Sequence, residues 1–333
     1  LTFAAKRLRN GMAGAVFWGI LGMGLVLVSI IIIRRFFFFY VWAAFLGFAC
    51  GFVEPGSTVL ISVLEKPGSS RLINLSQAFY CIGAIAAPQV VALVLHLELP
   101  WNLAFVILAG FIVLIAGLFR LLLPNGALRE KYEDHYHQDI NENAPGLLRS
   151  PLFLPLSAAI FLYVFVEGIF VVWLPALFEE TYSLAPASAA IRLSVYWFGL
   201  IVGRLGVVAL ADRVPKWLIV LSSCLAFTLL TAGMLIMGSA ISGTVVVLFL
   251  GLAAGPIWPG IVSIAGEYSR QARFTSTLIG IGALGLVFGP MLSGWIIRVK
   301  GFDVLMMMLV AVLGIMSALM FWSYARRKQA LPE

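Results

Sequence analysis

The chain has 333 residues, of which 62% are hydrophobic and 11% are charged, and its formal net charge is +7. A soluble domain has about a quarter of its residues charged, so this composition excludes a soluble globular protein and indicates that lipid is the solvent. The positive charge fits an asymmetry of membrane loops better than nucleic-acid binding, and all three cysteines lie inside apolar runs, which argues against disulfides.

The first part of the chain predicts four membrane helices. A spanning helix needs roughly 20 apolar residues, and such runs cover about 12–33, 36–64, 72–95 and 101–123. A basic flank of Lys6, Arg7 and Arg9 precedes the first run. We therefore expect residues 1–123 to form one membrane half with four helices.

A long polar segment, 124–150, separates this half from the rest of the chain. It contains a highly charged run and two prolines, which predicts a solvated loop. Four of its side chains offer metal-ligand chemistry, but clusters in charged loops are more often solvated: Asp134, His135, His137 and Asp139. We expect neither a metal site nor a cofactor.

The second half, 151–333, predicts six helices and a short basic tail. The helices are expected at about 152–178, 187–210, 217–237, 244–265, 275–297 and 304–324. The whole chain is therefore predicted to be an all-α, polytopic membrane protein with about ten transmembrane helices, arranged as four plus six.

The distribution of Lys and Arg predicts the orientation. If the N-terminus is cytoplasmic and the helices alternate, most of the 22 Lys and Arg residues lie at cytoplasmic ends. The exceptions are Arg34, Arg35, Arg192, Arg298 and Lys300. Positive residues favour the cytoplasmic side, so both ends of the chain and the long loop are expected in the cytoplasm of a cell or plasma membrane.

An internal repeat relates the two halves. The run FLGFACGFVEPG, 45–56, returns as FLGLAAGPIWPG, 249–260, and seven of the twelve positions are identical. Glu54 is matched by Trp258. Repeats of a membrane half are typical of transporters, whose substrate site lies near the midplane between the halves.

The repeat also predicts what precedes the chain. The second predicted helix of the first half pairs with the fourth helix of the second half. The first half is therefore expected to lack two helices of a twelve-helix protein, and Leu1 is expected to lie near the end of the second of them.

The run GRLGVVALADRVPKW, 203–217, resembles the loop motif of the major facilitator superfamily, between the second and third helices of a half. The resemblance implies a cytoplasmic gating motif made of Gly203, Arg204, Asp212 and Arg213. A loop ion pair with little effect on stability is the alternative interpretation of Asp212 and Arg213.

A narrower resemblance is to the fucose permease-like group, the fucose–galactose–glucose:proton symporters. It rests first on an acidic residue, Glu54, before a stretch of small residues. It rests second on the run that opens the next helix, with Asn74, Leu75, Gln77, Phe79, Gly83 and Ala84. The third element is a motif around Glu167, with Tyr163, Val164, Trp173 and Leu174. The run GPIWP, 255–259, resembles the tenth helix of sugar facilitators more widely.

Two carboxylates are predicted near the middle of the bilayer. Glu54 lies about 18 residues into its helix and Glu167 about 16 into its own. An intramembrane carboxylate faces a cavity or a partner and marks a functional site. We expect both to serve proton coupling, and Glu167 also to contact substrate. A permanently protonated carboxyl, or a helix–helix hydrogen bond, is the structural alternative.

Four further side chains are candidates for substrate binding. Gln77 and Tyr80 lie one turn apart and offer the donors and acceptors that a hydroxylated ligand needs. Trp258 lies between two prolines, where a helix bends, and its indole resembles the ring that stacks on sugars in facilitators. Trp173 precedes Pro175 in a similar setting. Packing or an interfacial position is the alternative for both tryptophans.

These features predict a secondary active transporter for a small polar solute, a sugar, driven by protons through alternating access. The expected partners are the solute, protons and the lipid bilayer, without nucleic acid, and we expect a monomer. No hydrolytic constellation or ATP-binding loop occurs, so an enzyme is not expected. A transporter of another solute class, such as a drug or an organic metabolite, and a truncated receptor or paralogue that does not transport remain alternatives.

Overall fold

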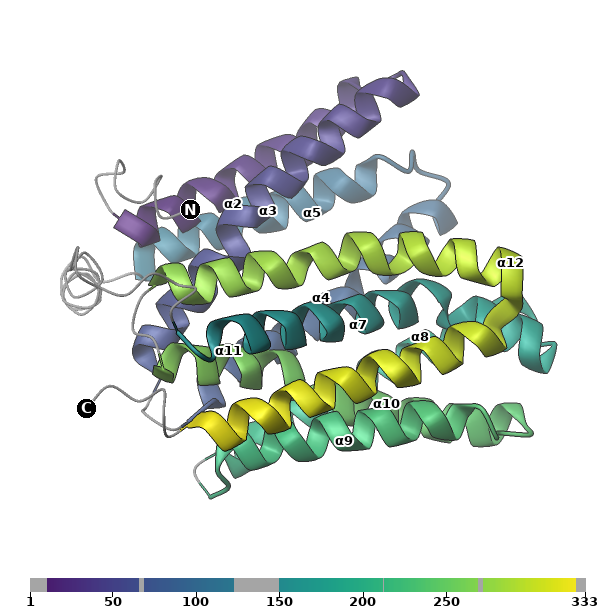
Figure 1. Ribbon diagram of the computed structural model, residues 1–333. Helices are drawn as coiled ribbons and strands as arrows, with labels where there is room; N and C mark the ends of the chain where they lie inside the picture. The colour runs from purple at the N-terminus through teal and green to yellow at the C-terminus, as the bar shows by residue number, and fades with distance from the viewer. Residues whose placement is uncertain (1–10, 66–68, 123–149, 212, 269–271, 328–333) are drawn as a thin grey trace. The chain divides into compact units, whose positions relative to one another are not determined.

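The computed structural model describes residues 11–65, 69–122, 150–211, 213–268 and 272–327 (Figure 1). Within these ranges the regular structure is helical and contains no strand. The polar loop predicted at 124–150, with its four candidate metal ligands, therefore falls almost entirely outside the described residues. The chain divides into two compact units.

Unit 1 comprises Leu1–Leu64, Gly83–Asn141 and Gln271–Ser276. Its main helices are α2 (Gly11–Val28), α3 (Phe36–Leu64) and α5 (Leu103–Leu122), and α2 packs against both others.

Small residues permit this close packing in unit 1. A Cβ added at Gly19 would lie 2.9 Å from Phe52 Cβ, and one at Gly24 would lie 3.1 Å from Val113. After α2 the chain forms the short 3₁₀ helix η1 (Ser29–Ile32), and the Trp42 indole donates to Val26 O at 2.5 Å. That bond gives a partner to a carbonyl near the end of α2, as membrane burial requires.

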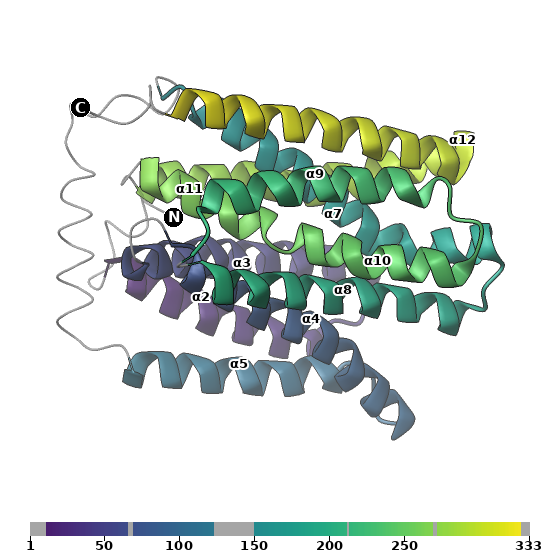
Figure 2. The same ribbon diagram turned by 90° about the horizontal axis from the view of Figure 1, so that it is seen from below.

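Unit 2 comprises Glu65–Ile82, Glu142–Arg270 and Thr277–Glu333. Its helices are α7 (Phe153–Tyr182), α8 (Pro186–Leu210), α9 (Lys216–Met234), α10 (Ala240–Ala254), α11 (Ile257–Tyr268) and most of α12 (Ala272–Arg326). Helix α8 packs on α7 and α10, while α9 packs on α10 and α11 (Figures 1 and 2). Helix α4 (Arg71–His96) contributes its first part to unit 2 and its remainder to unit 1.

Reciprocal glycine pairs bring the backbones of α8 and α10 into direct contact. Gly199 and Gly203 on α8 face Gly251 and Gly255 at the end of α10, four residues apart on each side. A Cβ at Gly199 would collide with Leu248 O, and one at Gly255 would lie 2.7 Å from Leu200 O. Small residues at this spacing are how membrane helices approach without a hydrophobic driving force.

Eight described stretches are long and apolar enough to cross a membrane. The last of them, Phe274–Arg326, turns at Gly301, whose φ of 80° a residue with a side chain rarely adopts. Figure 1 shows the two parts of α12 running in opposite directions from this turn. With α12 counted as two spans and with α4, which is long enough by residue count, the described helices supply the ten predicted spans.

Most helix boundaries agree with the sequence analysis, and one expected helix differs. The span predicted at 244–265 consists of two helices, α10 and α11, with Gly255 and Pro256 in a turn between them. Pro256 lacks an N–H, and its ring clashes with the preceding helical turn. The matched position in α3 is Phe52, and α3 stays helical through Pro55. A second proline therefore distinguishes the two copies of the repeat.

Candidate functional site

Glu167 lies half way along α7, and its carboxylate has a defined partner. The Tyr163 hydroxyl, one turn earlier on the same face, donates to Glu167 Oε1 at 2.8 Å. Tyr163 is fully buried. The carboxylate predicted near the midplane is thus held inside unit 2 by a phenol of its own helix.

Tyr163 also lies 3.0 Å from Ala254 O, the last carbonyl of α10, and both contacts have the hydroxyl as donor. A phenol has one O–H proton, so it donates fully to only one acceptor at a time. If Glu167 is protonated, it donates to Tyr163, and Tyr163 donates to Ala254 O. If Glu167 is ionised, Tyr163 donates to it, and Ala254 O loses this donor. The protonation state of Glu167 is therefore linked to the α10–α11 break.

At the break one backbone carbonyl lacks its helical donor, and a charged side chain of another helix donates to it. Gly255 O would accept from the residue four positions later in a regular helix, but that residue is Pro259, which has no N–H. Arg204 Nε of α8 donates to Gly255 O instead, at 3.2 Å. Arg204 thus supplies the donor that Pro259 lacks.

Arg204 is a deeply buried cation with neutral partners. It is 2% exposed, and its Nη1 donates to Gln77 O at 2.7 Å and to Cys81 Sγ at 2.6 Å, both on α4. Among the described residues no carboxylate oxygen lies within the 4.0 Å of an ion pair. A weaker electrostatic attraction to Glu167 remains. A buried charge without a close counter-ion is costly, which is typical of a functional rather than a packing residue.

Tyr196, about two turns before Arg204 on α8, adds a hydroxyl without a hydrogen-bond partner among the described residues. Its Oη is buried. Tyr196 lies near Glu167, Arg204 and Cys81. Buried polar groups normally have a partner, so this hydroxyl marks a polar place inside unit 2. We name Tyr163, Glu167, Tyr196, Arg204 and Cys81 the central cluster.

The two predicted substrate ligands on α4 lie in different surroundings. Gln77 contributes its backbone carbonyl to Arg204, while its side chain is half-buried. Tyr80 is 57% exposed, and its ring lies 6.1 Å from the ring of Trp197 on α8. Gln77 therefore adjoins the central cluster, and Tyr80 lies at an aromatic contact between α4 and α8.

The two predicted tryptophans are both placed in unit 2. Trp258, in α11 just after the break, is 6% exposed. Trp173 packs its ring against Gly294 of α12, where an added Cβ would lie 3.1 Å from the indole. The Trp173 Nε1 is buried and has no partner among the described residues. Trp173 thus combines a packing contact with an unused donor.

Glu54 lies in unit 1, and the central cluster lies in unit 2. It is an exposed residue of α3, and the residue after it is Pro55. The Ser57 and Thr58 hydroxyls donate to its backbone carbonyl at 3.1 and 2.8 Å. Its role in proton coupling stays a prediction.

The residues of the predicted gating motif lie in different environments. Gly203 packs on α10, and Arg204 belongs to the central cluster. Arg213 is exposed, and Asp212 lies outside the described residues. The next basic residue of the motif, Lys216, is 6% exposed and pairs with Glu267 of α11 at 2.9 Å.

Lys216 is the centre of a hydrogen-bond and ion-pair network at the start of α9 and the end of α11. Its Nζ also donates to Ser263 O and Oγ at 3.2 and 3.3 Å, and Ser263 Oγ donates to Ser69 O at 2.9 Å. Nearby, Glu65 Oε2 accepts from the first turn of α4, from Leu72 N and Ile73 N, and attracts Lys216 electrostatically. A carboxylate at a helix N-terminus is favourable. We name Lys216, Glu267, Ser263, Ser69 and Glu65 the Lys216 network.

Sequence reasoning missed several residues that these sites use. Tyr163 was part of a recognised motif but had no assigned role, and Tyr196, Cys81 and Lys216 were not singled out. One signal was available for Arg204: Pro259 leaves a carbonyl without a donor, so a side chain must satisfy it within the membrane. The helix that supplies that side chain is not readable from sequence.

Comparison with protein families gives one match. The family described as "Major Facilitator Superfamily" matches residues 9–281, which is most of the chain. A search of curated protein sequences found no match.

Several solved structures have a similar fold. A variant of the E. coli fucose:proton symporter FucP has a TM-score of 0.79 at 15% identity, covering 96% of this chain and 85% of that one. The human organic anion transporter MFSD10 (TETRAN) has a TM-score of 0.76 at 16% identity, with coverage of 93% and 77%. The proton:xylose symporter XylE, bound to 6-bromo-6-deoxy-D-glucose, has a TM-score of 0.72 at 12% identity, with coverage of 95% and 80%. At these identities the likeness shows the fold.

Proposed function

The chain belongs to the major facilitator superfamily of membrane transporters. We propose that it moves a small polar solute, a sugar, together with protons, which the shared fold of FucP and XylE supports. It is a multi-pass membrane protein and a transporter rather than an enzyme. FucP, a fucose:proton symporter, and XylE, a proton:xylose symporter, share the fold.

The observation that carries the proton part of the proposal is the shared hydroxyl of Tyr163. It lies 2.8 Å from Glu167 Oε1 and 3.0 Å from Ala254 O. Protonation of Glu167 frees this hydroxyl for the carbonyl at the helix break. A proton thereby favours one arrangement of α10 and α11 over another, and differential affinity of this kind is what a coupled transporter requires.

In this proposal the four-helix half, 1–123, and the six-helix half, 151–333, alternate access to a midplane site. Glu54 and Glu167 take up protons. Gln77, Tyr80, Trp173, Trp258 and Glu167 contact the solute. Gly203, Arg204, Asp212 and Arg213, together with Lys216, control opening on the cytoplasmic side, where both ends of the chain lie. The transporter works as a monomer in a cell or plasma membrane.

The test is uptake into proteoliposomes that contain the purified chain. Radiolabelled hexoses, pentoses and deoxyhexoses are offered with an imposed inward proton gradient, and counterflow without a gradient serves as the second measurement. We expect accumulation of at least one sugar, which Glu167→Gln abolishes while counterflow survives. Uptake of no sugar, or a Glu167→Gln protein that accumulates sugar normally, contradicts the proposal.

A second candidate function is transport of an organic anion. Arg204 favours it, because a buried guanidinium with no carboxylate in ion-pair range among the described residues is suited to an anionic group. MFSD10, an organic anion transporter, shares the fold. Offering the same proteoliposomes a panel of carboxylates separates the two functions, since the anion candidate predicts carboxylate uptake that sugars do not inhibit.

A further inference from the structure

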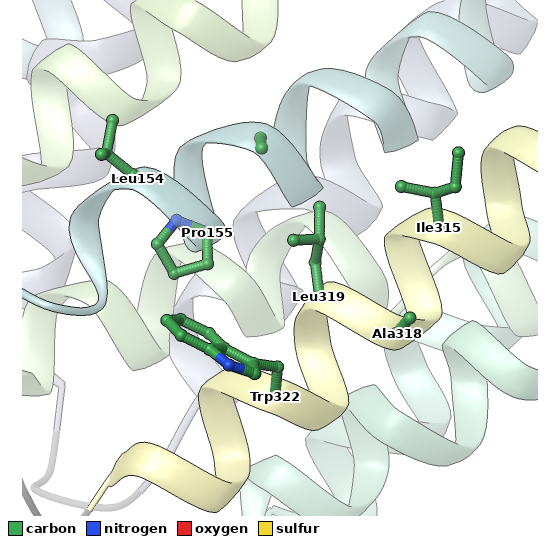
Figure 3. Close-up of a pocket in the computed structure, with 7 residues that line it drawn as sticks. Leu154, Pro155, Ile315, Ala318, Leu319 and Trp322 are labelled. Atoms are coloured by element: carbon green, nitrogen blue, oxygen red, sulfur yellow. The ribbon is translucent and has the colours of Figure 1, made fainter.

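An apolar groove lies between the first turns of α7 and the end of α12, away from the central cluster. Its volume is about 590 Å³, within the range of ~300–1,000 Å³ that small-molecule sites occupy. Leu154 and Pro155 of α7 line one wall, and Ile315, Ala318 and Trp322 of α12 line the other (Figure 3). All of these residues belong to unit 2.

The groove opens to the surface of its unit. Leu154 is 59% exposed, Ile315 57% and Trp322 41%. Figure 3 shows the Trp322 indole directed from α12 toward Pro155. Ile315 and Trp322 are seven positions apart, or about 10 Å along a helix, and half of a hydrocarbon core is about 15 Å. The groove therefore covers about two thirds of the length of an acyl chain in one leaflet.

A cation lies at the end of the groove. Arg326, in the last turn of α12, places its guanidinium carbon 4.5 Å from the centroid of the Trp322 ring. Among the described residues this ring is its one partner, so its N–H groups remain available to a ligand. The neighbouring Arg327 is engaged differently, because its Nη1 donates to Tyr324 O at 2.6 Å.

We propose that this groove binds an anionic phospholipid of the cytoplasmic leaflet, with one acyl chain along α7 and α12 and the phosphate at Arg326. A guanidinium binds phosphate through two parallel hydrogen bonds, and the ring beneath it holds it at the mouth of the groove. Basic residues between helix ends on the cytoplasmic side recognise anionic lipid head groups.

The experiment measures lipid retained by the purified full-length chain. The protein is incubated with vesicles of phosphatidylglycerol and phosphatidylcholine in equal amounts, and bound lipid is measured by native mass spectrometry. We expect about fivefold more phosphatidylglycerol than phosphatidylcholine, the preference that one basic residue near a charged surface gives.

Two variants separate the parts of the site. Arg326→Gln should remove the preference while leaving lipid bound, and Ala318→Phe should fill the groove and reduce both lipids severalfold. Arg120→Gln is the matched control, because Arg120 is also an exposed arginine in the last turn of a helix. It should leave the preference unchanged.

Several outcomes overturn the proposal. They are equal binding of the two lipids by the unmodified chain, an Ala318→Phe protein that retains lipid normally, and an Arg120→Gln protein that loses the preference as Arg326→Gln does. Stabilisation by soluble glycerol phosphate equal to that by the lipid would indicate a phosphate site without the groove. A change from dimer to monomer on Ala318→Phe would indicate that a second copy of the chain covers the groove.

Discussion

Replacement of Tyr163 by Phe tests the link between Glu167 and the helix break. The change removes one hydroxyl and keeps the ring, which packs 6.2 Å from the Phe227 ring. Both Glu167 Oε1 and Ala254 O lose the donor that lies 2.8 and 3.0 Å away. Neither acceptor gains a replacement from the new side chain.

The expected magnitude follows from that lost bond. Leaving a buried acceptor unpaired costs about 1–3 kcal/mol. A bound proton favours one of two conformations only by the difference between its interaction free energies with them. At 1.36 kcal/mol for each factor of ten, the loss corresponds to roughly a 5- to 150-fold lower accumulation ratio. Exchange of solute without a gradient does not need this difference, so it should change little.

The assay compares proton-driven accumulation with counterflow in the same proteoliposomes, for the unmodified chain, Tyr163→Phe and Glu167→Gln. If Tyr163 acts through Glu167, Tyr163→Phe should lose part of the accumulation that Glu167→Gln loses completely, and counterflow should survive in both. An equal fall of accumulation and counterflow in Tyr163→Phe, or unchanged accumulation in that variant, would refute the reasoning.

Three other substitutions test the described contacts. Gly203→Ala should lower the melting temperature by several degrees, because the added Cβ meets Leu252 O and overpacking costs about 1–3 kcal/mol. Gly206→Ala is the control and should not lower the melting temperature, because its added Cβ meets nothing within 4 Å. Lys216→Gln should destabilise the chain by about 1–3 kcal/mol, the scale of hydrogen bonds to a charged group, because the Glu267 side chain is 36% exposed and water can replace part of the lost contact. Arg213→Gln, at an exposed position, should cost less than about 0.5 kcal/mol in the same denaturation measurement. Glu54→Gln should abolish proton-driven accumulation and preserve counterflow; unchanged accumulation would remove Glu54 from the coupling mechanism.

The helices were largely predictable, because membrane spans depend on length and apolar content alone. The expected range 36–64 coincides with α3, and 72–95 differs from α4 by one residue at each end. The division at 255–256 was not predicted, although Pro256 and Pro259 indicated a bend. Proline removes donors, but whether the chain bends or breaks depends on which neighbouring side chains satisfy the freed carbonyls.

The candidate site was predictable only in part. An acid in an apolar run, such as Glu167, is visible in sequence because its insertion is costly wherever it faces. Arg204 was assigned to a loop motif from its place near a helix end. A helical side chain tilts toward the N-terminus, and the long Arg204 side chain thereby reaches Gly255 in the middle of the α10–α11 span. Lys216 pairs with a residue that is 51 positions later, and such distant pairing is decided by tertiary packing.

The glycine contact between α8 and α10 has a mechanical consequence. Backbones that touch through Gly199, Gly203, Gly251 and Gly255 leave no side-chain layer that could slide, so α8 and α10 move as one stiff pair. The contact stops at Gly255, where the helix ends, and α11 packs instead on α7 and α9. Bending of the α10–α11 span is therefore concentrated at Gly255–Pro256, which acts as a hinge between α10, held against α8, and α11, which can tilt.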